Sequence, residues 1–184
     1  MAIFKIENLK EHTQRLQERL IQYQPFKKCI LIGSGCSLKL GNFKDRIQNA
    51  DAVVIRVNRH PKPEFYQYYG NRYELMITWK RKVNEYNKEF SFQNKFFNSV
   101  VNQFFKSHIF SSTGLGCILL LGTLFDEIEL FGFGLTQRQF QDADFHYLDG
   151  TQFTSYHNLK IEDHLINQLQ TMYPGKIYRG EEQV

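Results

Sequence analysis

CILIGSGCS, residues 29–37, is the stretch that decides the fold: four apolar residues run directly into a turn that contains two glycines. A short apolar run closed by such a turn is typical of a buried parallel strand followed by a loop that can face a phosphate. Residues 52–57, AVVIRV, repeat the apolar pattern about 20 residues further on, after a polar connection long enough for a helix. The spacing predicts a β-α-β unit and therefore an α/β domain with a mostly parallel sheet.

The rest of the chain continues this alternation of strands and helices. Further helices are predicted at residues 9–23, 115–125 and 159–172, and further strands at residues 75–79, 128–134 and 176–178. Residues 61–110 are the hardest to interpret, and we expect residues 80–110 to form a mobile lid or loops that face a substrate. The last residues, 181–184, are expected to fray.

Composition limits the class of protein. At 184 residues with 42% hydrophobic residues, we expect a single domain over residues 1–184, with an N-terminal helix inside residues 1–25 and no separate substrate module. The net charge of +4 is scattered, which suits phosphate-bearing or acidic sugar ligands better than nucleic acid. The chain shows neither an apolar run of membrane-spanning length nor a secretory leader, so we expect a cytoplasmic protein.

The three cysteines, Cys29, Cys36 and Cys117, do not have the paired spacing of a zinc site or of a disulfide framework. We therefore expect free thiols in a reducing compartment and no metal.

Two polar segments stand where strands give way to helices. The turn at residues 33–37 lets a ligand approach the backbone closely, and a helix after it can direct N–H groups at an anion. Residues 112–114, Ser-Thr-Gly, bring hydroxyl groups to the start of an apolar helix, where a carboxylate or phosphate is favoured. Each segment also has a purely structural interpretation: a tight turn without a ligand for the first, and helix capping for the second.

Two histidines in the most polar loop are candidates for acid–base chemistry. His146 has Asp149 nearby in the sequence, and His157 has Glu162. An imidazole titrates near neutral pH, so it can accept a proton from a hydroxyl nucleophile or stabilise a departing phosphate. Ten residues separate the two histidines and no third ligand is clustered with them, which makes a metal site improbable.

In chain order, these segments resemble the four sialylmotifs of the animal-type sialyltransferases, glycosyltransferase family 29. The large motif is matched by residues 29–38 and 54–61, the small motif by residues 112–114 and 126–134, the third motif by residues 146–149, and the very small motif by His157 and Glu162. Four short matches in the right order would rarely arise by chance, so the resemblance favours the functional interpretation of each segment.

The resemblance implies a Rossmann-like domain, a GT-A variant, and an inverting displacement that uses CMP-sialic acid and needs no metal or other cofactor. His157 would be the general base on the acceptor hydroxyl, and His146 would steady the leaving phosphate. The remaining assignments are Gly33, Ser34, Ser37 and Asn58 at the cytidine monophosphate, Gly132, Phe133 and Gly134 at its ribose and base, Ser112, Thr113 and Gly114 at the donor carboxylate, Tyr147 beside His146, and Glu162 beside the base.

The sequence departs from the family pattern at several positions. Family members usually carry asparagine where Ser34 and Ser37 stand, so the hydrogen bonds there would be shorter or bridged by water. Cys29 falls where the family has one half of a disulfide, but Phe125 stands in place of the other half. That difference fits a bacterial or viral enzyme in a reducing cytosol. The bacterial sialyltransferases of family 42 are a more distant resemblance, and in them the roles of His146 and His157 would be exchanged.

The leading hypothesis is therefore a sialyltransferase-like enzyme that builds a bacterial surface glycan. Transfer of Kdo from CMP-Kdo is the nearest alternative, because that donor also carries a carboxylate on its anomeric carbon. A CMP-sugar binding module without catalysis is a third alternative. The expected partners are a CMP-sugar donor and a glycan acceptor, without nucleic acid; peripheral membrane association through a lipid-linked acceptor and a homo-oligomer both stay open.

Overall fold

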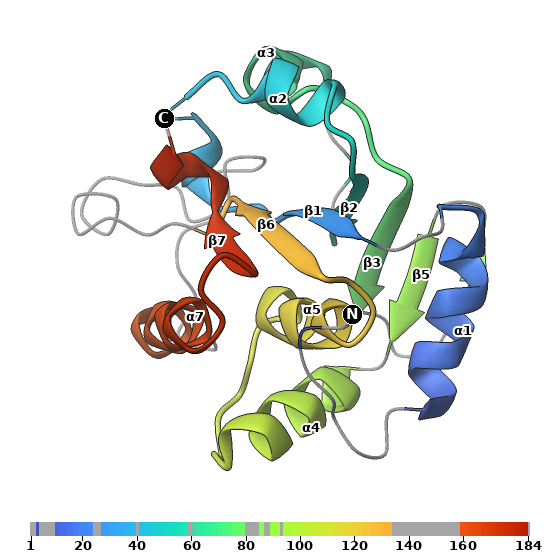
Figure 1. Cartoon of the computed structure of the whole chain (residues 1–184), viewed down its shortest axis with the longest axis vertical. Helices are drawn as coiled ribbons and strands as arrows, with labels where there is room; N and C mark the ends of the chain where they lie inside the picture. The colour runs from blue at the N-terminus through green and yellow to red at the C-terminus, as the bar shows by residue number, and fades with distance from the viewer. Residues whose placement is uncertain are drawn as a thin grey trace.

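The computed structural model contains a seven-stranded sheet with helices on both of its faces (Figure 1). It describes residues 3, 10–23, 27–39, 41–58, 60, 62–79, 85–86, 89–92, 94–133 and 159–183. The strands are β1 (Lys28–Ile32), β2 (Val53–Val57), β3 (Leu75–Trp79), β4 (Glu85–Tyr86), β5 (Glu89–Phe92), β6 (Glu127–Phe131) and β7 (Ile177–Arg179). Their order is β4-β5-β3-β2-β1-β6-β7, and among these described strands only β4 runs antiparallel to its neighbour. The predicted α/β fold with a mostly parallel sheet is confirmed.

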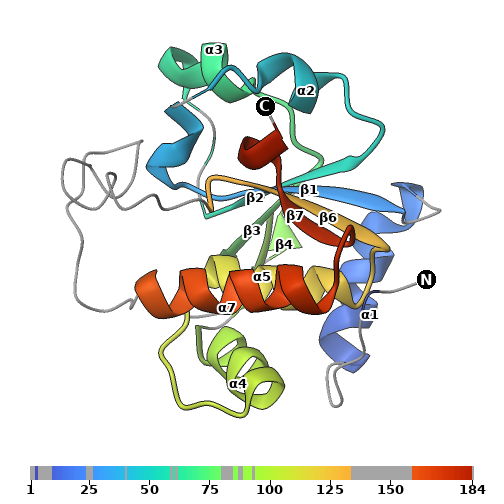
Figure 2. The same ribbon diagram turned by 60° about the vertical axis from the view of Figure 1, so that its left-hand side comes forward.

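The helices form a layer on each side of the sheet (Figure 2). One side holds α2 (Lys44–Gln48) and α3 (Tyr66–Tyr69), and the other holds α1 (Lys10–Leu20), α4 (Asn94–Phe105), α5 (Thr113–Gly122) and α7 (Leu159–Met172). The short 3-10 helices are η1 (Ile21–Tyr23), η2 (Cys36–Lys39), η3 (Pro63–Phe65) and η4 (Gly180–Gln183). Crossovers between parallel strands are right-handed, and the chain leaves the sheet centre in opposite directions from β1 and from β6. The two sets of helices therefore lie on opposite faces.

The centre of the sheet is a topological switch point. β1 pairs with β2 on one side and with β6 on the other, both in parallel. In such sheets, ligands bind beyond the carboxyl ends of the two strands where the order reverses. The turns that follow β1 and β6 are therefore the expected position of a binding site, and these turns carry Gly33 and Gly132.

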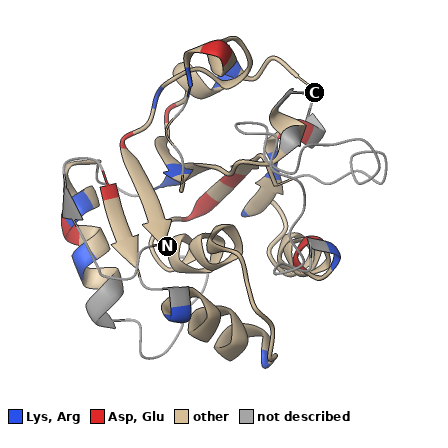
Figure 3. Ribbon diagram, turned by 180° about the vertical axis from the view of Figure 1, so that it is seen from behind, with Lys and Arg blue, Asp and Glu red and all other residues tan. Residues whose placement is uncertain are grey.

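The larger part of the core lies between the sheet and α5. Every residue of α5 is buried, and none is charged, as Figure 3 shows by its uniform colour. Gly116 is needed where α4 packs on α5, because a Cβ atom there would lie 2.4 Å from the Phe97 ring. A helix that is apolar on all sides belongs inside a protein, so α5 is held from both sides and its first turn is fixed relative to the sheet.

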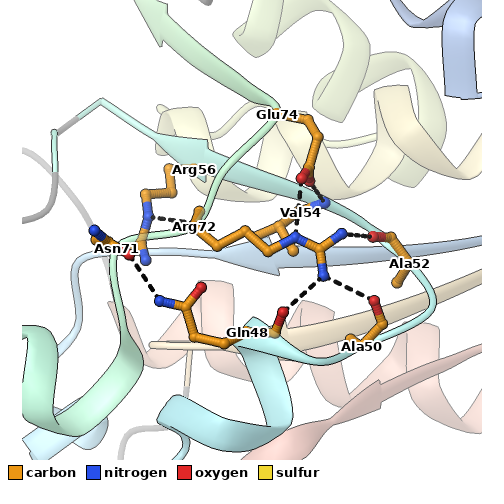
Figure 4. Close-up of polar contacts among 8 residues, drawn as sticks. All are labelled: Gln48, Ala50, Ala52, Val54, Arg56, Asn71, Arg72 and Glu74. Carbon is orange, nitrogen blue, oxygen red and sulfur yellow. Dashed lines mark hydrogen bonds and ion pairs between the residues drawn. The ribbon is translucent and has the colours of Figure 1, made fainter.

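On the opposite face, hydrogen bonds from Arg72 connect α2 and the residues after it to the start of β2 (Figure 4). The guanidinium of Arg72 donates hydrogen bonds to the carbonyl oxygens of Gln48, Ala50 and Ala52 at 3.2, 2.8 and 2.9 Å. Its Nε also donates to Glu74, whose second carboxylate oxygen accepts a hydrogen bond from a backbone amide of β2. These contacts satisfy carbonyl groups outside the strands, which fixes the connection that leads into β2.

A charged cluster occupies the amino-terminal part of the β1–β6–β7 region. The Lys28 ammonium lies 2.8 Å from a Glu129 oxygen and 3.2 Å from a Glu127 oxygen, and it donates a hydrogen bond to the Tyr178 hydroxyl. Arg46 of α2 forms a second ion pair with Glu129. Glu129 is almost fully buried. A buried carboxylate is tolerated because two cations compensate it.

A lid over residues 80–110 as a whole stays a prediction, but two described segments inside that range belong to the core instead. Residues 89–92 form β5, which pairs with β3 inside the sheet, and α4 packs its Phe97 and Val101 into the core. The aromatic rings of Phe90, Phe92 and Phe97 are buried and contact one another in sequence. A lid must open without exposing core side chains, so these two segments do not form one.

Other predicted elements lie close to their observed bounds, including the helix of residues 9–23, which appears as α1 followed by η1. Cys29 and Cys117 are buried free thiols, and burial raises the pKa of each well above its ordinary value. Among the residues that the structure describes, no helix is both long and apolar enough to cross a bilayer.

Candidate active site

The turns after β1 and β6 pack directly on each other. The Gly33 amide donates to the Phe131 carbonyl at 2.8 Å, and the Gly35 amide donates to the Gly132 carbonyl at 3.1 Å. A Cβ atom at Gly33 or Gly35 would lie 2.8 or 2.5 Å from the Gly132 oxygen. Gly132 itself has a φ of +75°, a conformation that side chains disfavour. The glycines therefore have a structural reason that holds without any ligand.

Phe133 joins the two turns to the start of α5. A Cβ atom at Gly33 would lie 3.1 Å from the Phe133 ring, and one at Gly114 would lie 2.8 Å from the same ring. The ring is partly buried and packs against the core. Three segments that the sequence predicts for donor binding, from β1, α5 and β6, thus meet at one aromatic side chain.

The first turn of α5 is capped by Ser112. Its hydroxyl oxygen accepts a hydrogen bond from the Leu115 amide at 3.2 Å, and its backbone is extended, as is usual for this position. Thr113 follows as a buried residue. The capping that the sequence left as an alternative is therefore present. It does not exclude anion binding, because the remaining amides of a first helical turn have no acceptor within the helix.

Glu162 connects α7 to the start of α5. Its side chain is 6% exposed, and one of its carboxylate oxygens accepts a hydrogen bond from the Ser112 amide at 2.6 Å. Burial raises the pKa of Glu162 above its ordinary value, and its hydrogen bonds with Ser112 partly oppose that rise. The structure thus brings Glu162 beside the Ser-Thr-Gly segment, 50 positions away in the sequence.

The other predicted donor contacts follow β1 and β2. Ser34 lies in the turn between Gly33 and Gly35 and is partly exposed. Asn58 follows β2, is exposed, and has a φ of 64°. Its side-chain oxygen accepts a hydrogen bond from the Trp79 amide at 3.2 Å, which joins the ends of β2 and β3. Both residues therefore stand at the carboxyl edge of the sheet, as a donor site at the switch point requires.

Ser37 and Glu181 form a contact that the sequence does not predict. Ser37 is buried, and its hydroxyl donates a hydrogen bond to a Glu181 carboxylate oxygen at 2.9 Å. The same oxygen accepts a hydrogen bond from the Gly132 amide. The expectation that residues 181–184 fray is wrong for Glu181, because these two hydrogen bonds hold it in η4. A short charged tail carries no sequence pattern that would have identified it.

The proposed catalytic residues lie outside the described residues. This applies to His146 and His157, and equally to Gly134 and Tyr147, so their roles stay predictions. Within the described residues, no group of three or more His, Cys, Asp or Glu side chains is placed to hold a metal ion.

Comparison with known proteins identifies the family. The model of glycosyltransferase family 29 (sialyltransferase) matches residues 71–173, which is more than half of the 184 residues. The chain therefore belongs to glycosyltransferase family 29, the sialyltransferases. It is a glycosyltransferase, and the family implies a nucleotide-sugar donor and a glycan acceptor. The matched range contains Ser112, Phe133 and Glu162, whereas the β1 turn lies outside it.

Two solved structures share the fold. A mammalian sialyltransferase in complex with Gal-beta-1-3GalNAc-ortho-nitrophenol aligns with a TM-score of 0.63 and 18% identity, over 97% of this chain and 87% of that chain. A second structure of a mammalian sialyltransferase aligns with a TM-score of 0.64 and 19% identity, over 96% of this chain and 80% of that chain. A comparison with curated protein sequences found no match. The structural alignments extend the shared fold to the β1 turn, and the resemblance to family 42 stays a prediction.

Proposed function

We propose that this chain transfers sialic acid from CMP-sialic acid to a glycan hydroxyl by an inverting displacement that needs no metal. The observation that carries the proposal is the meeting of Gly33, Gly114 and Phe133, because it joins the switch point of the sheet to the start of α5. A nucleotide suits the switch point of the sheet, since its phosphate can approach glycine backbone closely. An acidic sugar suits the start of α5.

The start of α5 is the proposed site of the donor carboxylate. The first amides of a helix carry partial positive charge, and a carboxylate there is favoured by about 0.3–1 kcal/mol, or more when partly buried. Ser112 supplies the cap, while Thr113 and Gly114 would present amides and a hydroxyl group. Because Glu162 accepts a hydrogen bond from the Ser112 amide, it fixes this turn without occupying the amides that follow.

The remaining donor contacts would come from the turns. Gly33, Ser34 and Asn58 would contact the cytidine monophosphate, and Gly132 with Phe133 would line its ribose and base. All of these stand beyond the carboxyl ends of β1, β2 and β6. Gly134 and Tyr147 are assigned to the same site from the family motifs alone.

The chemical step would be a single displacement. His157 would accept the proton of the acceptor hydroxyl while the hydroxyl oxygen bonds to the anomeric carbon. The bond between that carbon and the phosphate oxygen breaks, and its electron pair leaves with CMP. His146 would donate a hydrogen bond to the phosphate as its negative charge grows. A positioned base of this kind contributes about 10²- to 10⁴-fold to the rate.

The anchoring of α7 supports the choice of His157. Glu162 ties the first turn of α7 to Ser112, and His157 precedes Leu159, the first residue of that helix, by only two positions. The base is therefore proposed on the segment that leads directly into the helix fixed beside the carboxylate site.

The test is donor-dependent release of CMP. The chain is incubated with CMP-sialic acid or with CMP-Kdo and a panel of glycan acceptors, with and without EDTA. We expect release from CMP-sialic acid that EDTA does not change. Release from CMP-Kdo alone would favour the Kdo alternative, since the carboxylate site suits both donors. Binding of CMP without any turnover would favour the non-catalytic module, an alternative that membership of an enzyme family disfavours.

The base is tested by His157→Ala beside the control His164→Ala, which changes an exposed histidine of α7. We expect the first variant to lose about 10²-fold or more in kcat and the second to keep full activity. If His157→Ala turned over at the normal rate while His146→Ala did not, the two histidines would have the exchanged roles.

A further inference from the structure

Glu181 occupies a position between the two glycine turns of the candidate site. It lies in η4, the short helix that follows the edge strand β7. One oxygen of its carboxylate accepts two hydrogen bonds, one from the Gly132 amide after β6 and one from the Ser37 hydroxyl in η2 after β1. A single atom therefore connects the segments that follow the two strands at the switch point.

The helix η4 is placed by contacts independent of this carboxylate. Gly180 lies flat against the Phe131 ring, since a Cβ atom there would come within 2.2 Å of the ring. Arg46 of α2 also donates a hydrogen bond to the Gly180 carbonyl at 3.2 Å. These contacts hold the backbone before Glu181, so that its side chain is aimed at the turns.

The carboxylate is costly to hold in this position. It is largely buried, and burial raises the pKa of Glu181, although the hydrogen bonds from Gly132 and Ser37 and the charge of Arg179 oppose the rise. Its second oxygen has no hydrogen-bond partner among the described residues. A carboxylate without a role in this position would gain more from full hydration. The cost indicates that the connection between the turns has a use.

We propose that Glu181 is a positioning residue for donor binding, which holds the turns after β1 and β6 at the separation that the CMP group requires. The inference rests on the proposed function, because it assumes that CMP binds between these turns. It also changes the role of Ser37: the hydroxyl acts through Glu181 on the shape of the turn, in addition to any direct contact with the nucleotide.

The physical reason lies in the glycine content of the turns. Glycine segments have more conformational freedom than other residues, and a ligand that must order them binds more weakly. A hydrogen bond to a charged group is stronger than one between neutral groups, so a carboxylate is an effective way to order both turns before the donor arrives.

The experiment compares Glu181→Ala, Glu181→Gln and the control Glu18→Ala, which changes an exposed glutamate of α1. Hydrogen–deuterium exchange measures the protection of the Gly132 amide, and calorimetric titration measures the affinity for CMP. We expect Glu181→Ala to lose the protection at Gly132 and to weaken CMP binding about tenfold, the size expected for losing hydrogen bonds to a charged group. Glu181→Gln keeps an acceptor oxygen and should stay within about threefold of the unaltered chain.

A second variant keeps the test decisive if Glu181→Ala does not fold. Ser37→Ala removes only one of the two hydrogen bonds, and we expect it to weaken CMP binding by about threefold with Gly132 still protected. With CMP-sialic acid and an acceptor, Glu181→Ala should raise the donor KM about tenfold and change kcat much less, because positioning affects binding before the chemical step.

The outcomes separate the two proposals. If the unaltered chain binds CMP and folded Glu181→Ala binds it equally well, the role of Glu181 is overturned and the proposed function is untouched. If the unaltered chain does not bind CMP or CMP-sialic acid, the proposed function is overturned, and with it the donor role of Glu181.

Discussion

The two ends of the β1–β6 pair are built in opposite ways. At the amino-terminal end, Lys28 and Glu127 belong to the charged cluster, in which ion pairs and the Tyr178 hydroxyl compensate one another. At the carboxyl end, Gly33 and Gly132 bring backbone against backbone. Side chains fill the first end, whereas main chain packed on main chain forms the second.

The difference separates residues that contribute to stability from residues that contribute to donor binding. The charged cluster can be altered at the expense of stability alone, since its groups interact with one another. The glycine end combines positive φ, close contacts and buried carboxylates, which are the features that proteins tolerate at functional sites. Four experiments, taken from the largest expected effect to the smallest, test whether stability and donor binding separate along this line.

Gly132→Ala should have the largest effect. A left-handed conformation costs a non-glycine residue about 1–2 kcal/mol, and the contact of 3.0 Å between the added Cβ atom and the Gly33 oxygen adds about 1–3 kcal/mol. Gly175→Ala is the matched control, because Gly175 has a φ of +71° but nothing within 4 Å. Urea unfolding should show the larger loss at Gly132, and CMP binding should fail only there. Equal losses in the two variants would refute the close packing of the turns.

Lys28→Met tests the charged end. It leaves buried Glu129 with Arg46 as its remaining partner, and since Lys28 is itself partly exposed we expect a loss of about 2 kcal/mol, below the value for a fully buried pair. The CMP affinity, measured by calorimetric titration, should stay within twofold. A marked loss of CMP affinity in a folded variant would show that the two ends are coupled.

Ser112→Ala separates capping from recognition of the donor. Loss of the cap should lower the free energy of unfolding by about 1 kcal/mol, and Ser112→Gly should cost only a few tenths. CMP lacks the carboxylate of the donor sugar, so its affinity should be unchanged, while the affinity for CMP-sialic acid should fall. If Ser112→Ala and the unaltered chain bound CMP-sialic acid equally well, Ser112 would act only as a helix cap.

The smallest effect is expected from the pH dependence of Glu162. Its folded pKa is raised by burial, so between the unfolded and the folded pKa values the native chain binds more protons than the unfolded chain. Its contribution therefore favours folding at acidic pH, and this part is lost as the pH rises through the folded pKa. Glu162→Gln should gain stability relative to the unaltered chain as the pH rises from 4 to 7. Urea midpoints across this range measure the difference, with Glu18→Gln as the exposed control; a constant difference would contradict the raised pKa.

Much of the fold could be predicted from local patterns. β1, β3 and α7 lie within about one residue of their predicted bounds, because each is a buried or amphipathic run closed by glycine, proline or polar residues. The sequence does not predict β5 or α4. For β5, the four residues EFSF carry too little periodicity to indicate a strand. These four residues form a strand because β3 offers an edge for parallel pairing.

The candidate site divides in the same way. Ser112 as a helix cap and Gly33 as a turn residue follow from their neighbours in the chain, and the order of the motifs identified the family that the comparisons confirm. The hydrogen bond between Glu162 and Ser112 joins the small and very small motifs, while their roles at a shared site stay predictions. The position of Phe133 against two glycines could not be predicted, because nothing local determines where a partly buried ring will pack.

The sequence by itself determined the alternation of strands and helices, the glycine turns and the capped start of α5, because each depends on neighbours a few residues apart. Only the tertiary structure decided that the Glu181 side chain lies beside Ser37 and Gly132, which are 144 and 49 positions away. Hydrogen bonds over such separations form when the sheet order brings β1, β6 and β7 side by side. Periodicity and caps describe single elements, whereas the geometry between elements depends on how all of them pack.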